Sequence, residues 1–248
     1  MIIRLKQDSL MLFVNNTYGG SDMRRAFTLL ELIICITVLL TLLAILLPVF
    51  FQIKKDSNKI TTLSNIKQLG FAWRMYISDY DDTLMRAVVL GDHWWGDNKG
   101  KAMLSPYINL SSLSDPSLKY YKFDNTYNFS GYGYNSYFSP VDNKNNPIPV
   151  DYSQISEPTE TVAFGTAAGL FNVNNSYGLY PVSTLTSPNW YFPTFHGRYN
   201  GFGIICWADG HTSIMKAKNF SHNIEYKKKN LGEIDKDNNP FTIEYFDL

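Results

Sequence analysis

Hydrophobic residues form one unbroken block near the start of the chain. Residues 32–51 are 20 in number and include no charged side chain. At about 1.5 Å per helical residue, this block covers the roughly 30 Å hydrocarbon core of a bilayer. A core helix of a soluble domain would have a polar face, and the apolar region of a signal peptide is shorter, roughly 7–15 residues. The block therefore predicts a retained membrane-spanning helix over residues 27–51.

After residue 51 the apolar positions recur at steps of three and four residues, with charged and polar residues between them. The stripe comprises Ile60, Leu63, Ile66, Leu69 or Gly70, Trp73, Tyr76 or Ile77, and Tyr80. This spacing predicts that the helix continues as an amphipathic segment over residues 52–80, with a globular domain packed on its apolar face. Pro48 lacks a backbone N–H, so a helix kink is predicted at that residue.

Residues 81–248 contain short apolar runs broken by Gly, Pro, Asn and Ser, which is typical of strands and turns. Short strands are expected within residues 83–90, 127–138 and 161–164. The clearest signal is Asp209-Gly210 between two β-rich runs, which predicts a hairpin with a type I′ turn. The expected fold is α+β, with a long N-terminal helix packed on a small, mainly antiparallel β-sheet domain.

The charges around the apolar block indicate its orientation in the membrane and identify one candidate functional residue. Arg24 and Arg25 precede it, whereas residues 54–56 are mixed in sign, so the positive-inside rule favours a cytoplasmic N-terminus. Glu31 is the exception at the start of the block. A carboxylate inside a bilayer helix costs a few kcal/mol, which makes Glu31 a candidate functional residue. The alternative is that Glu31 lies at headgroup level, where the positive helix end tolerates it.

The composition argues against nucleic acid as a partner and against a disulfide within the chain. The chain has 22 basic and 22 acidic residues, so its net charge of zero provides no basic surface for nucleic acid. Cys35 lies in the apolar block and Cys206 far downstream, so the two are expected in different compartments and unpaired.

The sequence Arg25-Ala26-Phe27-Thr28-Leu29-Leu30-Glu31, with Pro48 21 residues beyond Phe27, resembles the cleavage and methylation segment of type IV prepilins and type II secretion pseudopilins. The resemblance implies that prepilin peptidase cuts between Ala26 and Phe27 and methylates the new amine of Phe27. It also implies that Glu31 pairs with the terminal amine of a neighbouring subunit in a filament. Ala26 stands where a Gly is usual, and it is also small.

Residues 1–26 would be the leader, which is long for this class. Met23 would begin a compact basic leader by itself, and Gly19-Gly20 can be encoded by a ribosome-binding sequence just upstream. Residues 1–22 are therefore hypothesised to result from a misplaced start codon.

Segments beyond the helix resemble the paralogous pseudopilin-like family of planctomycete and Lentisphaerae type. The resembling segments are residues 63–70, 75–82, 132–137, 155–162, 198–201 and 208–211. Tyr199, Asp209 and Gly210 mark the C-terminal signature of that family. Tyr199 stands where the signature has a His, and Asp115-Pro116 stands where a Cys-Pro is usual. A polar or metal site built on the signature His would be lost in this chain.

The sequence lacks the common catalytic and zinc-binding motifs, and its one calcium-like run is incomplete. No Gly-x-Ser-x-Gly, His-Glu-x-x-His or paired-cysteine zinc spacing occurs. His196 and His211 could approach one another across the final hairpin, but solvated strand histidines are more common. Residues 235–239 imitate the start of a calcium loop, although Pro240 occupies the position that needs Gly. No catalytic residue, metal or cofactor is therefore predicted, with calcium as a weak alternative.

Exposed aromatic residues would support a different function. Trp94, Trp95, Trp190, Tyr191 and the tyrosines of residues 120–137 could stack on sugar faces, although most are expected in the core.

The sequence thus predicts a non-enzymatic pseudopilin-like subunit of a type II secretion or type IV pilus-like filament. Its domains would be a leader (1–26), a transmembrane helix (27–51), an amphipathic continuation (52–80) and an exported globular domain (81–248). Expected partners are prepilin peptidase, other pseudopilin subunits and the cytoplasmic membrane, but no nucleic acid. The chain would cross that membrane once, with its C-terminal domain extracytoplasmic. The alternative is a membrane-tethered polysaccharide-binding module that uses the pilin segment for export and anchoring.

Overall fold

The computed structural model describes residues 28–89, 92–94, 102–110, 113–118, 131–140, 142–143, 146, 148–173, 176–180, 182, 184–185, 194–220, 224–235 and 245–246. The chain divides into two compact units, residues 1–48 and 49–248. Ala26, Phe27 and the leader lie outside the described residues.

Helix α1 (Leu29–Asp79) is 51 residues long and passes through Pro48 without interruption of its helical assignment. The long helix expected from the apolar block and the stripe is therefore confirmed, while the kink at Pro48 stays a prediction. Two left-handed residues end the helix, Asp81 at φ 51° and Asp82 at φ 61°. The N–H of Asp82 donates to the carbonyl of Ile77 at 3.0 Å, which satisfies a carbonyl of the last turn.

A five-stranded sheet follows, in the order β10-β9-β4-β3-β7. Its strands are β3 (Tyr132–Asn135), β4 (Val162–Thr166), β7 (Thr184–Leu185), β9 (Phe202–Trp207) and β10 (Thr212–Lys216). All neighbours pair antiparallel except β7, which runs parallel to β3. The α+β fold with a mainly antiparallel sheet is confirmed.

Three strand pairs and short helices complete the described elements. The pairs are β1 (Val88–Val89) with β2 (Asp92–His93), β5 (Gly169–Val173) with β6 (Ser176–Tyr180), and β8 (Phe195–His196) with β11 (Leu231–Gly232). The helices are α2 (Ile224–Lys228), η3 (Ser136–Phe138) and η4 (Tyr152–Gln154). The strand expected over 83–90 is therefore only the two residues of β1 among the positions described there.

Trp73 is fully buried in the core that α1 shares with the sheet. Its ring stacks on Phe138 at 5.9 Å between centroids and meets Phe164 edge-on at 6.1 Å. Its indole N–H donates to the hydroxyl of Tyr134 at 3.0 Å, so its one polar atom is satisfied inside the core. The amphipathic half of α1 is thereby joined to strands β3 and β4.

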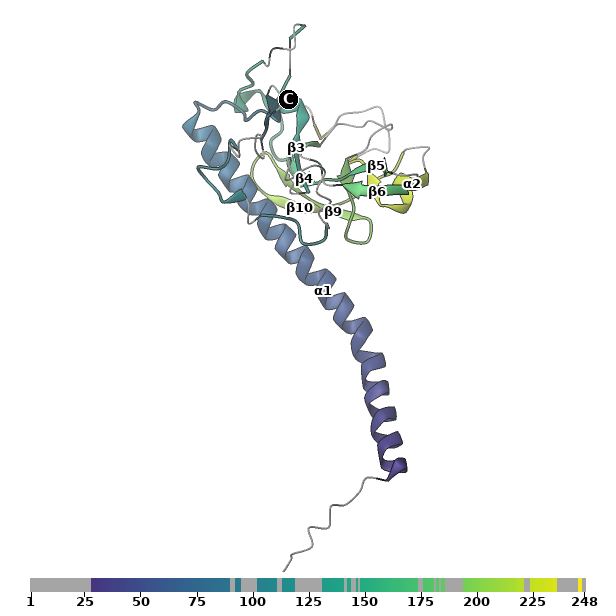
Figure 1. Ribbon diagram of the computed structural model, residues 1–248. Helices are drawn as coiled ribbons and strands as arrows, with labels where there is room; N and C mark the ends of the chain where they lie inside the picture. The colour runs from purple at the N-terminus through teal and green to yellow at the C-terminus, as the bar shows by residue number, and fades with distance from the viewer. Residues whose placement is uncertain are drawn as a thin grey trace, which may run out of the picture. The chain divides into compact units, whose positions relative to one another are not determined.

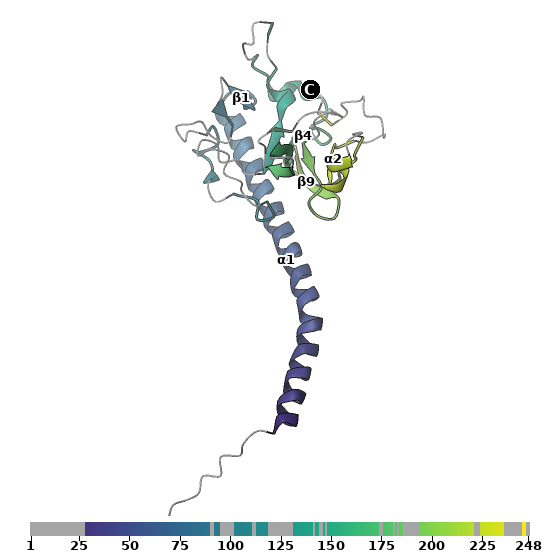
Figure 2. The ribbon, with the colours of Figure 1, turned by 45° about the vertical axis from the view of Figure 1, so that its right-hand side comes forward.

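Strand β9 separates two cores because its side chains alternate between the faces of the sheet. Ile204 and Cys206 belong to the core shared with α1. Ile205 and Trp207 belong to a second core, together with Phe195 and other residues. Both views place α2 on the side of β9 away from α1 (Figures 1 and 2).

The hairpin expected at Asp209-Gly210 is confirmed, but its turn differs from the expectation. The N–H of Trp207 donates to the carbonyl of His211, which leaves a three-residue loop. Only Gly210, at φ 96°, has a positive φ in this loop, whereas a type I′ turn needs two such residues. A single left-handed glycine after an ordinary turn joins β9 to β10.

The stripe expected to face the domain is confirmed only in its middle. Ile66, Leu69 and Trp73 are fully buried, but Ile60 is 68% exposed and Tyr80 53% exposed, so the prediction was wrong for the two ends. Two polar residues, Thr62 and Asn65, are buried on the same face. The face of the helix that meets the domain is therefore partly polar.

Gly70 is the point of closest approach between α1 and β9. A Cβ atom at this position would lie 2.6 Å from the Sγ of Cys206 and 4.0 Å from its Cβ. Since Cys206 is fully buried, its sulfur has no free space to move into.

We expect Gly70→Ala to destabilise the protein by about 1–3 kcal/mol through overpacking. In a Cys206→Ala background the obstructing sulfur is absent, so Gly70→Ala should stabilise by up to about 1 kcal/mol from helix propensity. Urea unfolding of the detergent-solubilised chain, followed by tryptophan fluorescence, measures both effects. Equal destabilisation in the two backgrounds would contradict the contact.

Candidate functional site

Helix α1 begins with a reciprocal cap between Thr28 and Glu31. The N–H and the hydroxyl of Thr28 both donate to Oε2 of Glu31 at 2.9 Å. The N–H of Glu31 donates back to the Thr28 hydroxyl oxygen at 3.2 Å. This is the capping box, in which the N-cap residue and the third helical residue satisfy each other's backbone donors. Glu31 is thus held at the very first turn of the apolar helix.

The apolar block that follows is exposed along its whole length. Part of α1 is long and apolar enough to cross a membrane, and none of the residues in that window is buried. A core helix of a soluble protein would bury most of such a stretch. The exposed block instead needs lipid or other apolar helices around it.

At the other half of α1, a buried carboxylate joins three parts of the chain. Asp115 is 1% exposed, and its Oδ2 accepts from the hydroxyl of Thr62 at 2.9 Å. The Nη1 of Arg198 lies 2.8 Å from the same oxygen, as a charge pair without an aligned hydrogen bond. The Nη2 of Arg198 donates to the carbonyls of Gly131 and Ala167. The helix, the segment at 115 and the segment at 198 are thereby connected.

Tyr199 extends this network to the helix backbone. Its hydroxyl donates to Thr62 Oγ1 at 2.7 Å, lies 3.3 Å from the carbonyl oxygen of Asn58, and is also 3.1 Å from Ser117 Oγ. Burial, reinforced by the negative charge of Asp115, raises the pKa of Tyr199. Tyr199 is therefore a neutral hydrogen-bonding partner of α1.

Tyr199, Asp209 and Gly210, which were expected to mark a C-terminal signature, do not lie together in one site. Tyr199 pairs with Phe202 at the start of β9, whereas Asp209 and Gly210 form the turn after its end at Trp207. A six-residue strand spans roughly 20 Å, so these residues cannot act on one ligand atom. Asp209 instead accepts from His211, with its Oδ1 2.6 Å from the ring Nδ1.

The two histidines considered as a pair also lie at opposite ends of β9. The carbonyl of His196 accepts from the Thr166 hydroxyl, which also accepts from the N–H of Ile204, near the start of the strand. His211 lies beyond the other end and stacks on Trp207. Within the described residues, no group of three or more His, Cys, Asp or Glu side chains could hold a metal ion.

His196 is buried, and its surroundings disfavour protonation of the ring. Its Nε2 lies 3.1 Å from the carbonyl of Lys229, while its Nδ1 makes no hydrogen bond to a described residue. Burial, together with the positive charge of Arg198, lowers the pKa of His196 well below its ordinary value. The folded state therefore keeps this ring neutral.

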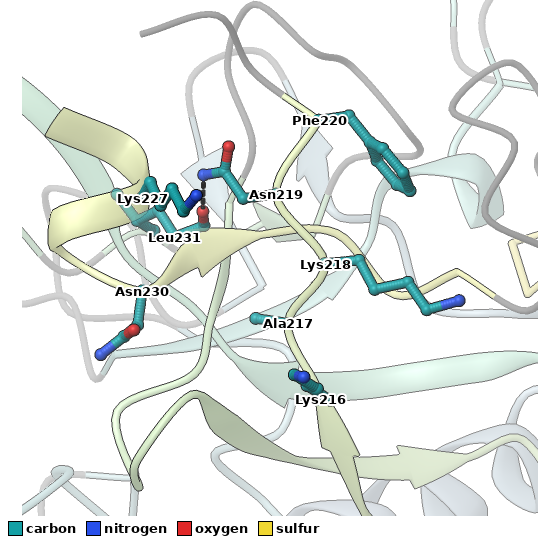
Figure 3. A pocket seen from close by; sticks show the side chains of 8 residues that line it. All are labelled: Lys216, Ala217, Lys218, Asn219, Phe220, Lys227, Asn230 and Leu231. Carbon is teal, nitrogen blue, oxygen red and sulfur yellow. Dashed lines mark hydrogen bonds between the residues drawn. The ribbon is translucent and has the colours of Figure 1, made fainter. Parts of the chain in front are cut away.

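Asp235, the first residue of the calcium-like sequence, is buried and bound to Lys218, with 2.9 Å between Oδ1 and Nζ. Residues 236–240 lie outside the described part of the chain. Lys218 also lines a groove with Lys216, Lys227 and others, but Figure 3 shows the side chain of Lys218 extending away from Lys227. The groove thus does not focus its lysines on one anion.

Trp94, one of the aromatics considered for sugar stacking, is fully buried in the core shared with α1. It meets Phe164 edge-on at 5.3 Å. Trp95, Trp190 and Tyr191 lie outside the described residues.

Sequence reasoning identified Glu31 but missed its partner Thr28, although the Thr-x-x-Glu pattern before an apolar run was a readable signal. It also missed Thr62, Asp115 and Arg198 as a network. No local signal could have found them, since the three lie far apart in the sequence.

Comparison with known families matches residues 22–47 to the family described as the prokaryotic N-terminal methylation motif. The matched residues include Ala26, Phe27 and Glu31 and continue through residues 32–47 of the apolar block. No curated protein and no solved structure matches the chain.

We expect Arg198→Met to destabilise the protein by about 3–5 kcal/mol, because it leaves the buried carboxylate of Asp115 without its counter-charge. Adding Asp115→Asn should recover part of this loss. Tyr199→Phe, which removes one hydroxyl from the same network, serves as the matched control and should cost only about 0.5–1.5 kcal/mol. Urea denaturation provides the three values, and a small loss in Arg198→Met would refute the importance of the charge pair.

Stability should fall with acid because of His196. The unfolded chain takes up a proton at its ordinary pKa of about 6.5, whereas the folded chain does so only at much lower pH. The contribution is therefore fully present above pH 6.5 or so and is lost as pH falls below it, by at most about 1.4 kcal/mol per pH unit. Urea unfolding between pH 7 and pH 5 should show a flatter slope for His196→Gln than for the unaltered chain, and equal slopes would contradict the role of His196.

Proposed function

We propose that this chain is a pseudopilin-like structural subunit of a type II secretion or type IV pilus-like filament. The observation that carries the proposal is the methylation motif at residues 22–47 at the start of a continuous helix whose apolar part is wholly exposed. The motif supports a processed, pilin-like subunit rather than an enzyme. In this proposal prepilin peptidase cuts after Ala26 and methylates the amine of Phe27.

Each part of the chain then has a role. Residues 1–26 are the leader, and residues 27–51 cross the cytoplasmic membrane once. Residues 52–80 continue the helix, and residues 81–248 form the extracytoplasmic domain. The partners are the peptidase and other pilin-like subunits, and exposed apolar surface on the first half of α1 supports lateral packing with them.

In this proposal, Glu31 forms a charge pair with a neighbouring subunit during assembly. In a helix surrounded by lipid its charge is costly, and a neighbour's terminal amine would neutralise it where the dielectric is low. The cap with Thr28 holds the carboxylate at the helix start, adjacent to the site where the new amine is produced. Glu31 would thus be positioned for the amine before a neighbour arrives.

Processing is tested by intact mass and N-terminal sequencing of the membrane-extracted chain, expressed with and without prepilin peptidase. We expect N-methylated Phe27 as the first residue only when the peptidase is present. An N-terminus at Met1 or Met23 with active peptidase would overturn the proposal.

We expect Glu31→Ala to leave membrane insertion and cleavage largely intact but to abolish incorporation into filaments. Glu31→Gln separates two roles, because its carbonyl oxygen can still accept the Thr28 donors while the charge is gone. Both variants should fail if charge neutralisation drives assembly. Sheared filaments and membranes are compared by immunoblot, and normal incorporation of Glu31→Ala would refute the assembly role.

A further inference from the structure

Lys218 and Asp235 bring an amine and a carboxyl group into contact from two different parts of the sheet domain. Lys218 lies two residues after β10, and Asp235 lies three residues after β11. The Nζ of Lys218 is 2.9 Å from Oδ1 of Asp235, whose side chain is 1% exposed, while that of Lys218 is 26% exposed. The carboxyl carbon is one bond beyond Oδ1, so the amine nitrogen lies near the distance of about 3–3.5 Å at which groups react.

The backbone register places a second carboxylate beside this pair. The N–H of Lys218 donates to the carbonyl of Glu233 at 3.0 Å, and the N–H of Glu233 donates to the carbonyl of Lys218 at 2.8 Å. Two residues that exchange both bonds in an antiparallel pair lie directly opposite, so their side chains project to the same side. Glu233 is 3% exposed, so a buried carboxylate lies on the side of the chain that Lys218 occupies.

Apolar residues next to these groups face the second core. Ile234, between the two acidic residues, is 1% exposed and belongs to the same cluster as Phe246, and Ala217 packs against that cluster. Water therefore has little access from this side. A buried ion pair can neutralise itself by moving one proton from the ammonium to the carboxylate, which gives the amine and the acid that condense to an amide.

We propose that the side chains of Lys218 and Asp235 become joined by an amide bond. The neutral amine attacks Cγ of Asp235, the new N–C bond forms, and the C–O bond to the hydroxyl breaks. Glu233 accepts the proton that the nitrogen loses and passes it to the leaving oxygen, which departs as water. Ammonium and carboxylate thus become an amide and one water, and the balance needs no oxidant, reductant or cofactor.

Confinement offsets the obstacle to this condensation. In free solution the excess of water opposes formation of an amide. Groups held in reacting geometry behave as if they were present at about 10⁵–10⁸ M, which exceeds the concentration of water itself. The fold holds the amine and the carboxyl group together through the paired backbones of Lys218 and Glu233.

The bond would act as a covalent staple in this part of the domain. It closes residues 218–235 into a loop that contains α2, and it ties the segment after β11 to the edge strand β10 of the five-stranded sheet. Both cysteines of the chain are free, so no disulfide supplies such a constraint. Closing a loop restricts the unfolded chain and thereby stabilises the folded one. The inference goes beyond the proposed function and does not depend on it.

Peptide mapping of the full chain, purified from membranes in detergent, tests the bond. Trypsin cuts after unmodified lysine, so a simple ion pair yields residues 217–218 and 230–236 as separate peptides. The amide blocks cleavage at Lys218 and joins residues 217–227 to residues 230–236, with the loss of one water. We expect the joined peptide to account for most of this region. Recovery of the separate peptides alone overturns the inference.

Four variants assign the roles of the side chains. Asp235→Ala removes the carboxyl carbon and should abolish the joined peptide. Asp235→Asn should retain it, because a side-chain amide can react with release of ammonia in place of water. Glu233→Gln should abolish it or lower its yield strongly, since a carboxamide does not carry the proton. Lys216→Arg, on the same strand, is the matched control and should leave the joined peptide unchanged.

Two further outcomes count against the inference. An undiminished joined peptide in Glu233→Gln contradicts the role of Glu233, and its loss in Lys216→Arg contradicts the assignment to Lys218. Thermal melts identify any variant that fails to fold, and the peptide map of the unaltered chain decides the existence of the bond without them. The same spectra show whether Phe27 is the processed N-terminus, so failure of the cross-link and failure of the proposed function are distinguished.

Discussion

The packing of the globular domain depends on the close contact between α1 and strand β9. Gly70 allows the helix backbone to approach the sulfur of Cys206, and the large ring of Trp73 then reaches into the centre of the sheet. A wider spacing would separate Trp73 from Phe138 and from the hydroxyl of Tyr134. Because interiors are packed as densely as organic crystals, the two contacts require one another.

Polar contacts add to this apolar packing, because they fix the position along the helix at which the domain binds. Thr62 reaches Asp115, and Asp115 is neutralised by Arg198 from a distant part of the chain. A slip of the helix by one turn would leave these buried groups unpaired, which costs more than an apolar mismatch. The residues around Tyr199 therefore fix the position of the helix on the domain.

The chain thus separates two kinds of surface on one helix. The first half of α1 is apolar on every side and begins at the cap of Thr28 and Glu31, so its surface is suited to membrane and to other helices. The second half has one face occupied by the domain and leaves Phe71 and Met75 uncovered. The proposed assembly through the helix would use both surfaces.

The sequence by itself determined the features that depend on neighbouring residues. The charge-free block and the stripe predicted one long helix, the motif at residues 22–47 identified the processing segment, and Asp209-Gly210 predicted the hairpin. Each of these is set by backbone preference or by side chains within a few turns, so a short window of sequence is sufficient.

Only the tertiary structure decided which residues the helix buries. Thr62 is buried because Asp115, brought from another part of the chain, supplies its acceptor, while the apolar Ile60 is exposed because no strand reaches that turn. The parallel pairing of β7 with β3 and the charge pair of Arg198 were likewise not predicted from the sequence. Burial of a polar group is favourable only when its partner is present, and the partner's arrival depends on the fold of the whole domain.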